Sequence, residues 1–412
     1  MNKANLAILG AQWGDEGKGK IVDFLAEESD VIVRFSGGAN AGHTIVHEDV
    51  TYKLHLVPSG IIAPDTRVIL GSGMVIDPES LFEELDRLTE QGIEWEGRVF
   101  ISDRAHIVLP HYKELDKEQE RARSKPIGTT GRGIGVAYAQ KASRDGLRMI
   151  DSIDPAQVAL LPPEDRKFIA RFAARYAPLL IDLAAFMRTA PGAERHLLEG
   201  AQGALLDVDI GTYPYVSSGS SAAAGACVGA AIGPRGIDHV LGVFKAYSTR
   251  VGNGPFPSEF RGTDTDELEE LVRETGREYG VTTGRARRCG YLDLVALRYV
   301  CAVNSVDTLA LTHLDVYDTV ETPKLCIAYE TDGGVLEDFP ADINVLEESR
   351  PVTKSFSGWN RSIAECKSYE ELPEEARAYI EFIEEFVETP ISMISIGYER
   401  ERTIVRRNPW TE

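Results

Sequence analysis

Cysteine and basic residues are both scarce in this 412-residue sequence. The five cysteines (Cys227, Cys289, Cys301, Cys326 and Cys366) are far apart and form no Cys-x-x-Cys pair. This argues against a disulfide framework and a zinc site, and favours reduced thiols in a cytoplasmic protein. Lys and Arg number 44 against 65 Asp and Glu, which gives a net charge of −21. Such a balance argues against general binding to nucleic acid or anionic membranes, but a small anionic ligand responds to local charge instead.

Long hydrophobic runs are also missing. No stretch reaches the roughly 18 apolar residues of a membrane span, and the first residues lack the apolar region of a signal peptide. We therefore expect no membrane association. The hydrophobic fraction of 43% and the charged fraction of 26% are ordinary for a globular protein.

Apolar strands alternate with amphipathic helices along much of the chain. Strands are expected at residues 6–9, 31–35, 67–70 and 99–101. This alternation predicts an α/β fold with a large, mostly parallel central sheet flanked by helices. Residues 165–190 have the pattern of one long amphipathic helix. We expect a single domain over residues 1–412, with a helical insertion at about 105–190.

The first functional motif is a glycine-rich turn, residues 10–20, between an expected strand and helix. Backbone N–H groups and the helix dipole favour phosphate there, and Lys18 adds a positive charge. The pattern differs from the usual P-loop, because Gly19 replaces the hydroxyl residue that binds magnesium. Two acidic residues, Asp15 and Glu16, lie inside this loop. Carboxylates beside a phosphate imply that a cation binds there or that one of them takes a proton from the substrate. A tight turn with no ligand is the alternative.

A second glycine-rich segment, residues 37–44, follows the second expected strand and contains His43. Loops at the carboxyl ends of strands converge on the ligand crevice of a doubly wound sheet, so we expect His43 near Asp15. A carboxylate and an imidazole can act as general base and general acid. An ordinary hydrogen-bonded loop histidine is the alternative.

Four further segments carry groups suited to nucleotides. Residues 127–135 combine hydroxyls with flexible backbone amides that suit phosphate, and Gln202 offers an amide to a base edge. Residues 285–288 hold three arginines, which indicates an anion clamp, although a solvated face is the alternative. Asp315, at a strand end, can accept two N–H bonds from guanine, with a surface turn as the alternative.

Together these motifs resemble those of the adenylosuccinate synthetase family. The matching segments are residues 12–20, 42–44, 127–135, 199–203, 211–216 and 282–288. They occur in the family's order, and the resemblance runs from Leu6 to about Arg402. It implies a P-loop-like, GTP-using ligase that joins IMP and L-aspartate into adenylosuccinate, with GDP and phosphate as the other products.

The resemblance also implies a mechanism. Asp15 matches the family base that removes the N1 proton of IMP, which makes the 6-oxygen a nucleophile toward the γ-phosphate of GTP. His43 would stabilise the transferring phosphoryl group, and magnesium would neutralise its oxygens. The 6-phosphoryl intermediate would then lose phosphate to the aspartate amine.

The residues implied by the resemblance fall into five sets. The catalytic set is Asp15, Lys18, His43 and Gln202. The IMP set is Asp15, Glu16, Gly17, Lys18, Asn40, Ala41, Gly42, His43, Thr130, Arg144, Gln202, Ser217 and Arg285. The aspartate set is Val281, Thr282, Thr283, Gly284, Arg285, Ala286 and Arg287. The GTP set is Gly14, Asp15, Glu16, Gly17, Lys18, Gly19, Lys20, Gly42, His43, Thr44, Arg287, His313, Leu314, Asp315, Ser395, Ile396 and Gly397. The magnesium set is Asp15 and Gly42. A homodimer is implied too, with Arg144 reaching the IMP phosphate of the partner subunit.

Three positions depart from the family pattern. His313 stands where a lysine usually precedes Leu-Asp, and Ile396 replaces a threonine near guanine. Both changes remove polar contacts around the base. Ser217 replaces a threonine but keeps the hydroxyl. The segment between Arg148 and Leu198 is shorter than in many relatives, so no role is assigned there.

Three other functions compete with this hypothesis. Relatives that accept deoxyguanylate and make a diaminopurine precursor lack the loop aspartate, whereas Asp15 is present here. A GTP-binding regulatory switch would share a string like Thr312 to Asp315 but has no use for the Asp15 and His43 pair. A catalytically inactive structural dimer requires a broken site, and no expected catalytic position is replaced.

Overall fold

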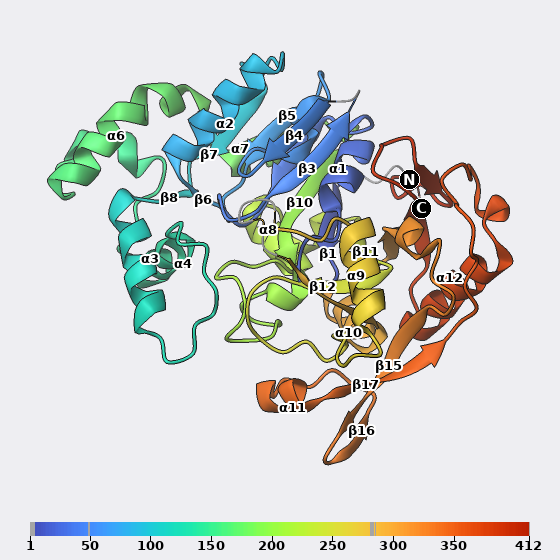
Figure 1. Ribbon diagram of the computed structural model, residues 1–412. Coiled ribbons are helices and arrows are strands. Elements are labelled where there is room, and N and C mark those ends of the chain that lie inside the picture. The colour runs from blue at the N-terminus through green and yellow to red at the C-terminus, as the bar shows by residue number, and fades with distance from the viewer. Residues whose placement is uncertain (1–4, 48–49, 281–283, 285, 412) are drawn as a thin grey trace.

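The computed structural model describes residues 5–47, 50–280, 284 and 286–411, and Figure 1 shows how their elements are arranged. Within these residues a ten-stranded sheet forms the centre of the molecule. Its strands, in spatial order, are β19 (Thr403–Val405), β18 (Ile391–Ser395), β14 (Thr308–Thr312), β11 (His239–Lys245), β1 (Asn5–Gly10), β10 (His196–Gly203), β2 (Val31–Arg34), β5 (Arg67–Leu70), β7 (Val99–Ser102) and β9 (Leu180–Ile181). Neighbouring strands are parallel except for β18 with β19. The predicted mostly parallel α/β sheet is confirmed.

Smaller sheets and helices complete the described part of the chain. The second sheet contains β12 (Tyr247–Arg250), β13 (Arg288–Asp293), β15 (Lys324–Thr331), β16 (Gly334–Leu336) and β17 (Arg350–Ser355). Two strand pairs are β3 (His43–His47) with β4 (Val50–Leu54), and β6 (Val75–Ile76) with β8 (His106–Ile107). The α-helices are α1 (Lys18–Ala26), α2 (Pro78–Glu90), α3 (Pro110–Ala122), α4 (Ile134–Ser143), α5 (Pro155–Val158), α6 (Pro163–Tyr176), α7 (Leu183–Thr189), α8 (Ala223–Gly229), α9 (Asp266–Thr275), α10 (Leu294–Asn304), α11 (Ile343–Glu348) and α12 (Glu374–Val387).

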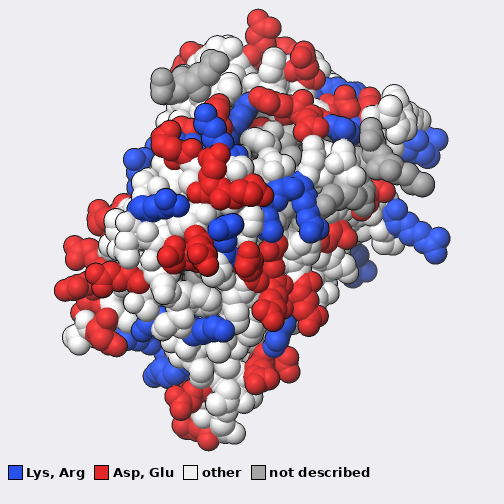
Figure 2. All heavy atoms as spheres, turned by 90° about the vertical axis from the view of Figure 1, so that its right-hand side faces the viewer, with Lys and Arg blue, Asp and Glu red and all other residues white. Residues whose placement is uncertain are grey.

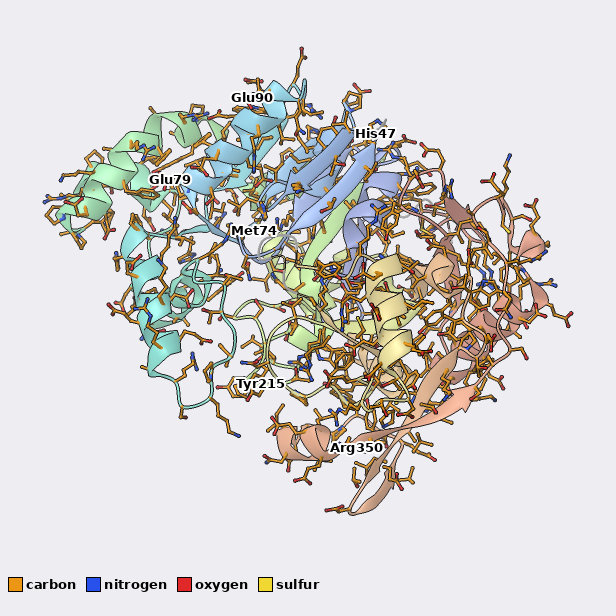
Figure 3. All side chains as sticks on the ribbon, viewed as in Figure 1. His47, Met74, Glu79, Glu90, Tyr215 and Arg350 are labelled. Carbon is orange, nitrogen blue, oxygen red and sulfur yellow. The ribbon has the colours of Figure 1, made fainter. Side chains whose placement is uncertain are left out.

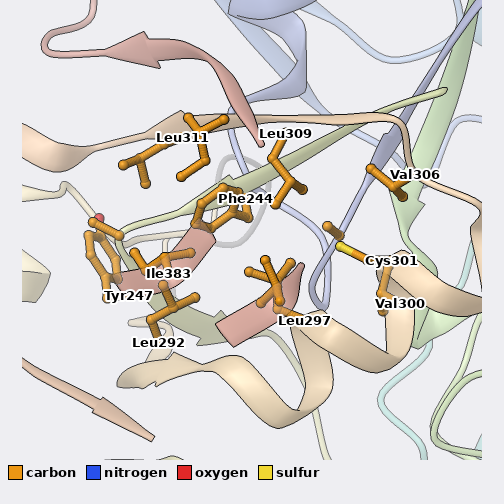
Figure 4. Packing of buried hydrophobic residues seen from close by; sticks show 14 of the residues in the cluster. Phe244, Tyr247, Leu292, Leu297, Val300, Cys301, Val306, Leu309, Leu311 and Ile383 are labelled. Carbon is orange, nitrogen blue, oxygen red and sulfur yellow. The ribbon is translucent and has the colours of Figure 1, made fainter. Parts of the chain in front are cut away.

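The central strands are apolar at consecutive positions because both faces of the sheet are covered. In β1, Leu6 and Ile8 pack into one hydrophobic core, and Ala7 and Leu9 pack into the core on the opposite face. The core shown in Figure 4 joins Phe244 and other strand residues to side chains of α10 and α12. Since successive side chains of a strand point to opposite faces, one strand supplies both cores.

The segment expected as a helical insertion has its helices α3, α4 and α6 to one side of the sheet, on the left of Figure 1. Met74, labelled in Figure 3, marks its junction with the sheet, because the Met74 carbonyl accepts a bond of 3.3 Å from the His106 N–H. The long helix predicted for residues 165–190 is wrong. The segment divides into α6, the edge strand β9 and α7. Pro178 lies in the break, and a proline has no N–H to continue the helix; residues 180–181 pair with β7 instead.

The molecular surface carries charges of both signs. On the face in Figure 2, acidic and basic side chains are interspersed rather than separated into large fields. Within the described residues, no helix has the length and apolar character that a membrane crossing requires.

Candidate active site

A pocket of about 490 Å³ opens where several strands of the central sheet end. Its lining includes residues that follow β1, β2 and β10, together with residues at or beyond the ends of β11, β14 and β18. Strands β10, β2, β5, β7 and β9 lie on one side of β1 in the sheet, and the later strands β11, β14 and β18 lie on the other. The loops that leave the strands on the two sides of β1 therefore run in opposite directions. A crevice at the carboxyl ends of strands near such a reversal is the usual ligand site of this architecture.

The loop from Gly10 to Lys18 is closed around the Glu16 carboxylate. This side chain is 0% exposed and accepts hydrogen bonds from the N–H of Gln12 at 3.1 Å and of Gly14 at 2.9 Å. Lys18 Nζ lies 2.6 Å from the same carboxylate. A Cβ added to Gly10 would stand 2.4 Å from a Glu16 oxygen, so the glycine makes room for it. Glu16 thus supports the loop from inside, and its carboxylate does not face the pocket.

Asp15, by contrast, lines the pocket and is 32% exposed. Its backbone has a φ of 61°, a left-handed conformation that only a few non-glycine residues adopt. The carboxylate lies 2.9 Å from Nε of Arg287. Of the two acidic residues in the loop, only Asp15 is therefore available to a ligand.

His43 lines the same pocket and is fixed from behind by a buried carboxylate. Its Nδ1 lies 2.9 Å from Glu199 Oε1 and 2.8 Å from the Ser59 hydroxyl. Glu199 is 0% exposed, and it also accepts from the N–H and the hydroxyl of Ser59. Burial would raise the pKa of Glu199, but hydrogen bonding and the charges of His43 and Arg34 outweigh burial and lower it. With Nδ1 occupied, Nε2 remains for a ligand.

Gly19 occupies the position at which a usual P-loop has a hydroxyl. A Cβ at Gly19 would stand 3.2 Å from the Cβ of His43. That distance is tighter than most real contacts, so a glycine lets the start of α1 approach β3 closely. A serine or threonine at position 19 would therefore crowd His43, which accounts for the absence of the usual P-loop hydroxyl.

The pocket lining also contains Lys20, His313 and Asp315. Lys20 Nζ donates to the hydroxyl of Ser395 at 2.7 Å and to the carbonyl of Gly397 at 2.8 Å, so it joins α1 to the loop after β18. Burial lowers the pKa of Lys20 to about 8, against the raising effect of Asp315. Burial also raises the pKa of Asp315 to about 6.

His313 is a neutral side chain in this environment. Burial, followed by the charge of Lys245, lowers its pKa to about 3. Its ring meets those of Tyr247 and Tyr398 edge-on, with centroids 6.0 and 6.1 Å away. The side chains of Leu314 and Ile396 are buried in the core at 0% and 1% exposure.

The structure gathers many of the residues expected from the sequence. Those that line the pocket are Gly14, Asp15, Glu16, Gly17, Lys18, Gly19, Lys20, Asn40, Ala41, Gly42, His43, Thr44, Gln202, Arg287, His313, Asp315, Ser395 and Gly397. Those described outside its lining are Thr130, Arg144, Ser217, Gly284, Ala286, Leu314 and Ile396. Val281, Thr282, Thr283 and Arg285 lie outside the described residues.

Several residues that line the pocket, or that support its side chains from behind, were not expected from the sequence. Glu199 lies within one of the motifs, so its position beside Gln202 was a usable signal. Asp23, which is nearly buried, forms a two-bond ion pair with Arg400 at 2.9 and 2.7 Å, and both line the pocket. Such pairs between distant parts of the chain leave no local sequence pattern. The same holds for Lys245, which lines the pocket beside Arg287.

Comparison with known proteins identifies the family of this site. Residues 7–161 and 163–404 match the sequence family described as adenylosuccinate synthetase. The chain belongs to the adenylosuccinate synthetase family. Adenylosuccinate synthetases from a Picosynechococcus species and from Trichodesmium erythraeum are each 46% identical over 430 residues. The alignments cover 98% of this chain and 96% or 97% of those proteins.

Solved structures agree with this assignment. Fully ligated adenylosuccinate synthetase from Plasmodium falciparum is similar with a TM-score of 0.90 and 39% identity, over 98% of this chain and 99% of that one. The cyanophage S-2L succinoaminodeoxyadenylate synthetase, bound to dGMP and dATP, has a TM-score of 0.64 at 21% identity, over 99% of this chain and 97% of that one. This second likeness shows the fold alone. The chain is a ligase of the adenylosuccinate synthetase family, whose substrates are IMP, L-aspartate and GTP.

Proposed function

We propose that this chain joins L-aspartate to C6 of IMP at the expense of GTP, in the pocket at the carboxyl ends of the central strands. The observation that carries the proposal is the placement of Asp15, His43 and Asp315 in one pocket, with Glu199 behind the imidazole. A single carboxylate and an oriented imidazole beside a phosphate-binding loop suit phosphoryl transfer to a purine oxygen.

Each side chain has a distinct task in this scheme. Asp15 takes the N1 proton of IMP, so that negative charge develops on the 6-oxygen and this oxygen attacks the γ-phosphate of GTP. Nε2 of His43 stabilises the charge on the phosphoryl group as it moves. Gln202 and Lys18 add an amide and a positive charge to the same region. Phosphate then leaves C6 as the amine of aspartate forms the new C–N bond.

Magnesium fits this donor set. The Asp15 carboxylate is partly exposed, and the backbone of Gly42 lines the pocket close to His43. Among the residues that the structure describes, no group of three or more His, Cys, Asp or Glu gathers to hold an ion by itself. Mg²⁺ is commonly held by one or two carboxylates together with substrate phosphates. Asp15 and the Gly42 carbonyl would hold the ion, whose charge would offset that of the phosphate oxygens.

We further propose a homodimer with Arg144 acting across the interface. Arg144 ends α4 in a left-handed conformation, is exposed and does not line the pocket of its own chain. Thr130 and Ser217, also expected to bind IMP, lie outside that lining too. A second copy that brings Arg144 to the pocket would complete the phosphate site.

A direct assay tests the main proposal. Purified protein with GTP, IMP, L-aspartate and magnesium should produce adenylosuccinate, followed by its absorbance, and omission of any one substrate should stop the reaction. Failure to form product under these conditions would contradict the proposal.

Asp15→Asn should remove turnover and leave the fold and GTP binding largely intact. Loss of a general base costs about 10²–10⁴-fold, and loss of a metal contact adds to this. Asp332→Asn is the control, because Asp332 is an exposed carboxylate between β15 and β16. A kcat for Asp15→Asn above about a tenth of the wild-type value would contradict its role as the base.

A further inference from the structure

Two short arms of the chain, residues 278–279 and 286–287, pair with each other just before Arg288 opens β13. The Arg287 N–H donates to the Glu278 carbonyl at 2.8 Å, and Tyr279 forms an antiparallel bridge with Ala286. Glu278 and Arg287 therefore face each other across the two arms, between α9 and β13. Because the two residues are joined through the backbone, contacts that hold Glu278 in place also hold Arg287 at its position beside the pocket.

The Glu278 carboxylate is held from three directions. Its side chain is 0% exposed, and Oε1 lies 2.5 Å from Nζ of Lys245 and 2.5 Å from the Tyr247 hydroxyl. Its Oε2 accepts from Nη1 of Arg287 at 2.6 Å. Burial would raise the pKa of Glu278, but Lys245, Arg287 and their hydrogen bonds lower it to about 2. The carboxylate is thus ionised and has no freedom to rotate.

Arg287 links the buried Glu278 carboxylate to the pocket. Its side chain is 10% exposed; one end of the guanidinium meets Glu278 and the other lies 2.9 Å from the Asp15 carboxylate. The guanidinium is thus held between a buried anion and the carboxylate at the reacting centre. An arginine pre-set by one fixed partner loses less freedom when it binds a ligand than a free one.

A contribution to stability does not by itself explain why the Lys245–Glu278 ion pair is buried. Taking two charges out of water costs about as much as their attraction returns, and apolar residues often serve as well. The Lys245 side chain is 1% exposed, and Nζ lies 5.3 Å from the Tyr247 ring centre. We infer that Glu278, supported by Lys245 and Tyr247, is the positioning residue that aims Arg287 at the reacting groups beside Asp15. This inference rests on the proposed function.

A double-mutant cycle tests the inference. Glu278→Gln keeps the shape but removes the charge that holds Arg287, and Arg287→Leu removes the guanidinium itself. Glu278→Gln should lower kcat/KM for aspartate by at least about 10-fold. In the Arg287→Leu background the same change should cost less than about 3-fold, since no guanidinium remains to be positioned. Losses that multiply in the double variant would overturn the inference.

Two further variants test whether a loss of activity comes only from a loss of stability. Glu278→Gln leaves Lys245 without its carboxylate partner. Lys245→Met with Glu278→Gln removes both charges of this pair and leaves Arg287 with Asp15 as its partner, so it should melt close to wild type while showing the same loss of kcat/KM. Tyr247→Phe deletes one hydroxyl that supports Glu278. Its matched control is Tyr329→Phe, which deletes a buried hydroxyl 2.7 Å from the buried Asp293 carboxylate.

The two tyrosine variants separate positioning from simple stability. Both should lower the melting temperature, but only Tyr247→Phe should lower kcat/KM. Equal kinetics in the two variants would count against Glu278 as a positioning residue. Wild-type protein is assayed first: absence of adenylosuccinate there contradicts the proposed function, whereas an active wild type with multiplicative losses contradicts the role of Glu278 alone.

Discussion

At the scale of single residues, His43 is held by a buried neighbour that does not line the pocket. Glu199 holds Nδ1 at 2.9 Å and is itself fixed by Ser59. Glu199→Gln keeps the volume but removes the charge that orients and supports the imidazole. We expect kcat to fall about 10- to 100-fold, the usual cost of losing an orienting partner, with little change in KM for IMP.

The measurement is steady-state kinetics with Ser59→Ala alongside. Ser59→Ala removes the hydroxyl that contacts both Glu199 and Nδ1 of His43 but leaves the Glu199 charge, so it should cost less than Glu199→Gln. A kcat that is unchanged in Glu199→Gln would show that His43 needs no support from this carboxylate.

We propose that Asp315 decides which nucleotide base the pocket accepts. Its carboxylate can accept from guanine N1–H and the 2-amino group, whereas adenine would leave a mostly buried charge unpaired. Asp315→Asn should raise KM for GTP and improve use of xanthosine triphosphate, whose 2-oxygen accepts from the new amide. The measurement is kcat/KM for both nucleotides, and a ratio that does not fall would contradict this role.

The pH dependence of GTP use gives a second check on Asp315. Since burial raises its pKa to about 6, the carboxyl becomes protonated as the pH falls below that value, and it then loses an acceptor for guanine. KM for GTP should therefore rise below about pH 6 in the wild type and stay nearly flat in Asp315→Asn.

At the scale of elements, helix α10 begins on a carboxylate that is costly to bury. Asp293 caps the helix by accepting from the Ala296 N–H at 3.0 Å. Burial raises its pKa from 3.8 to about 6, so the folded state binds this proton more tightly than the unfolded state. The contribution of Asp293 to the free energy of unfolding is therefore largest below about pH 4, falls as the pH rises toward 6, and is constant above it.

Asp293→Asn should remove this dependence. Asparagine caps helices about as well as aspartate, and it carries no charge to bury. Relative to wild type, the variant should gain on the order of 3 kcal/mol between pH 4 and pH 8. Urea unfolding at both pH values measures the difference, and a gap between the two proteins that is independent of pH would contradict the assignment.

At the scale of the whole molecule, one chain does not bring every expected IMP residue to its pocket. Arg144, Thr130 and Ser217 do not line the pocket of their own chain. Inactive Arg144→Leu protein mixed with inactive Asp15→Asn protein should recover activity, because a mixed dimer contains one site with both wild-type residues. Native mass spectrometry checks that subunits have exchanged. No recovery after verified exchange would argue against the action of Arg144 in trans.

The sequence by itself determined the architecture and most of the pocket. Strands such as β1 and β2 are local apolar runs, and glycines that permit close approach stay visible in the sequence because no other residue fits. Asp15 and Asp315 follow β1 and β14 closely, and His43 opens β3 after the loop that follows β2, so the parallel topology brings all three to one end of the sheet. The predicted helix over residues 165–190 failed because an apolar period does not reveal that residues 180–181 pair with β7.

Tertiary structure alone decided which polar groups face the ligand and which support it. The sequence places Asp15 and Glu16 side by side in one loop, and the fold turns Glu16 inward onto backbone amides while it leaves Asp15 beside Arg287. The Lys245–Glu278 pair joins residues 33 positions apart. Burying a charge is tolerable only with partners on several sides, and those partners come from separate elements that meet only after folding. Local patterns therefore predict where a site forms, while its charge network depends on the completed fold.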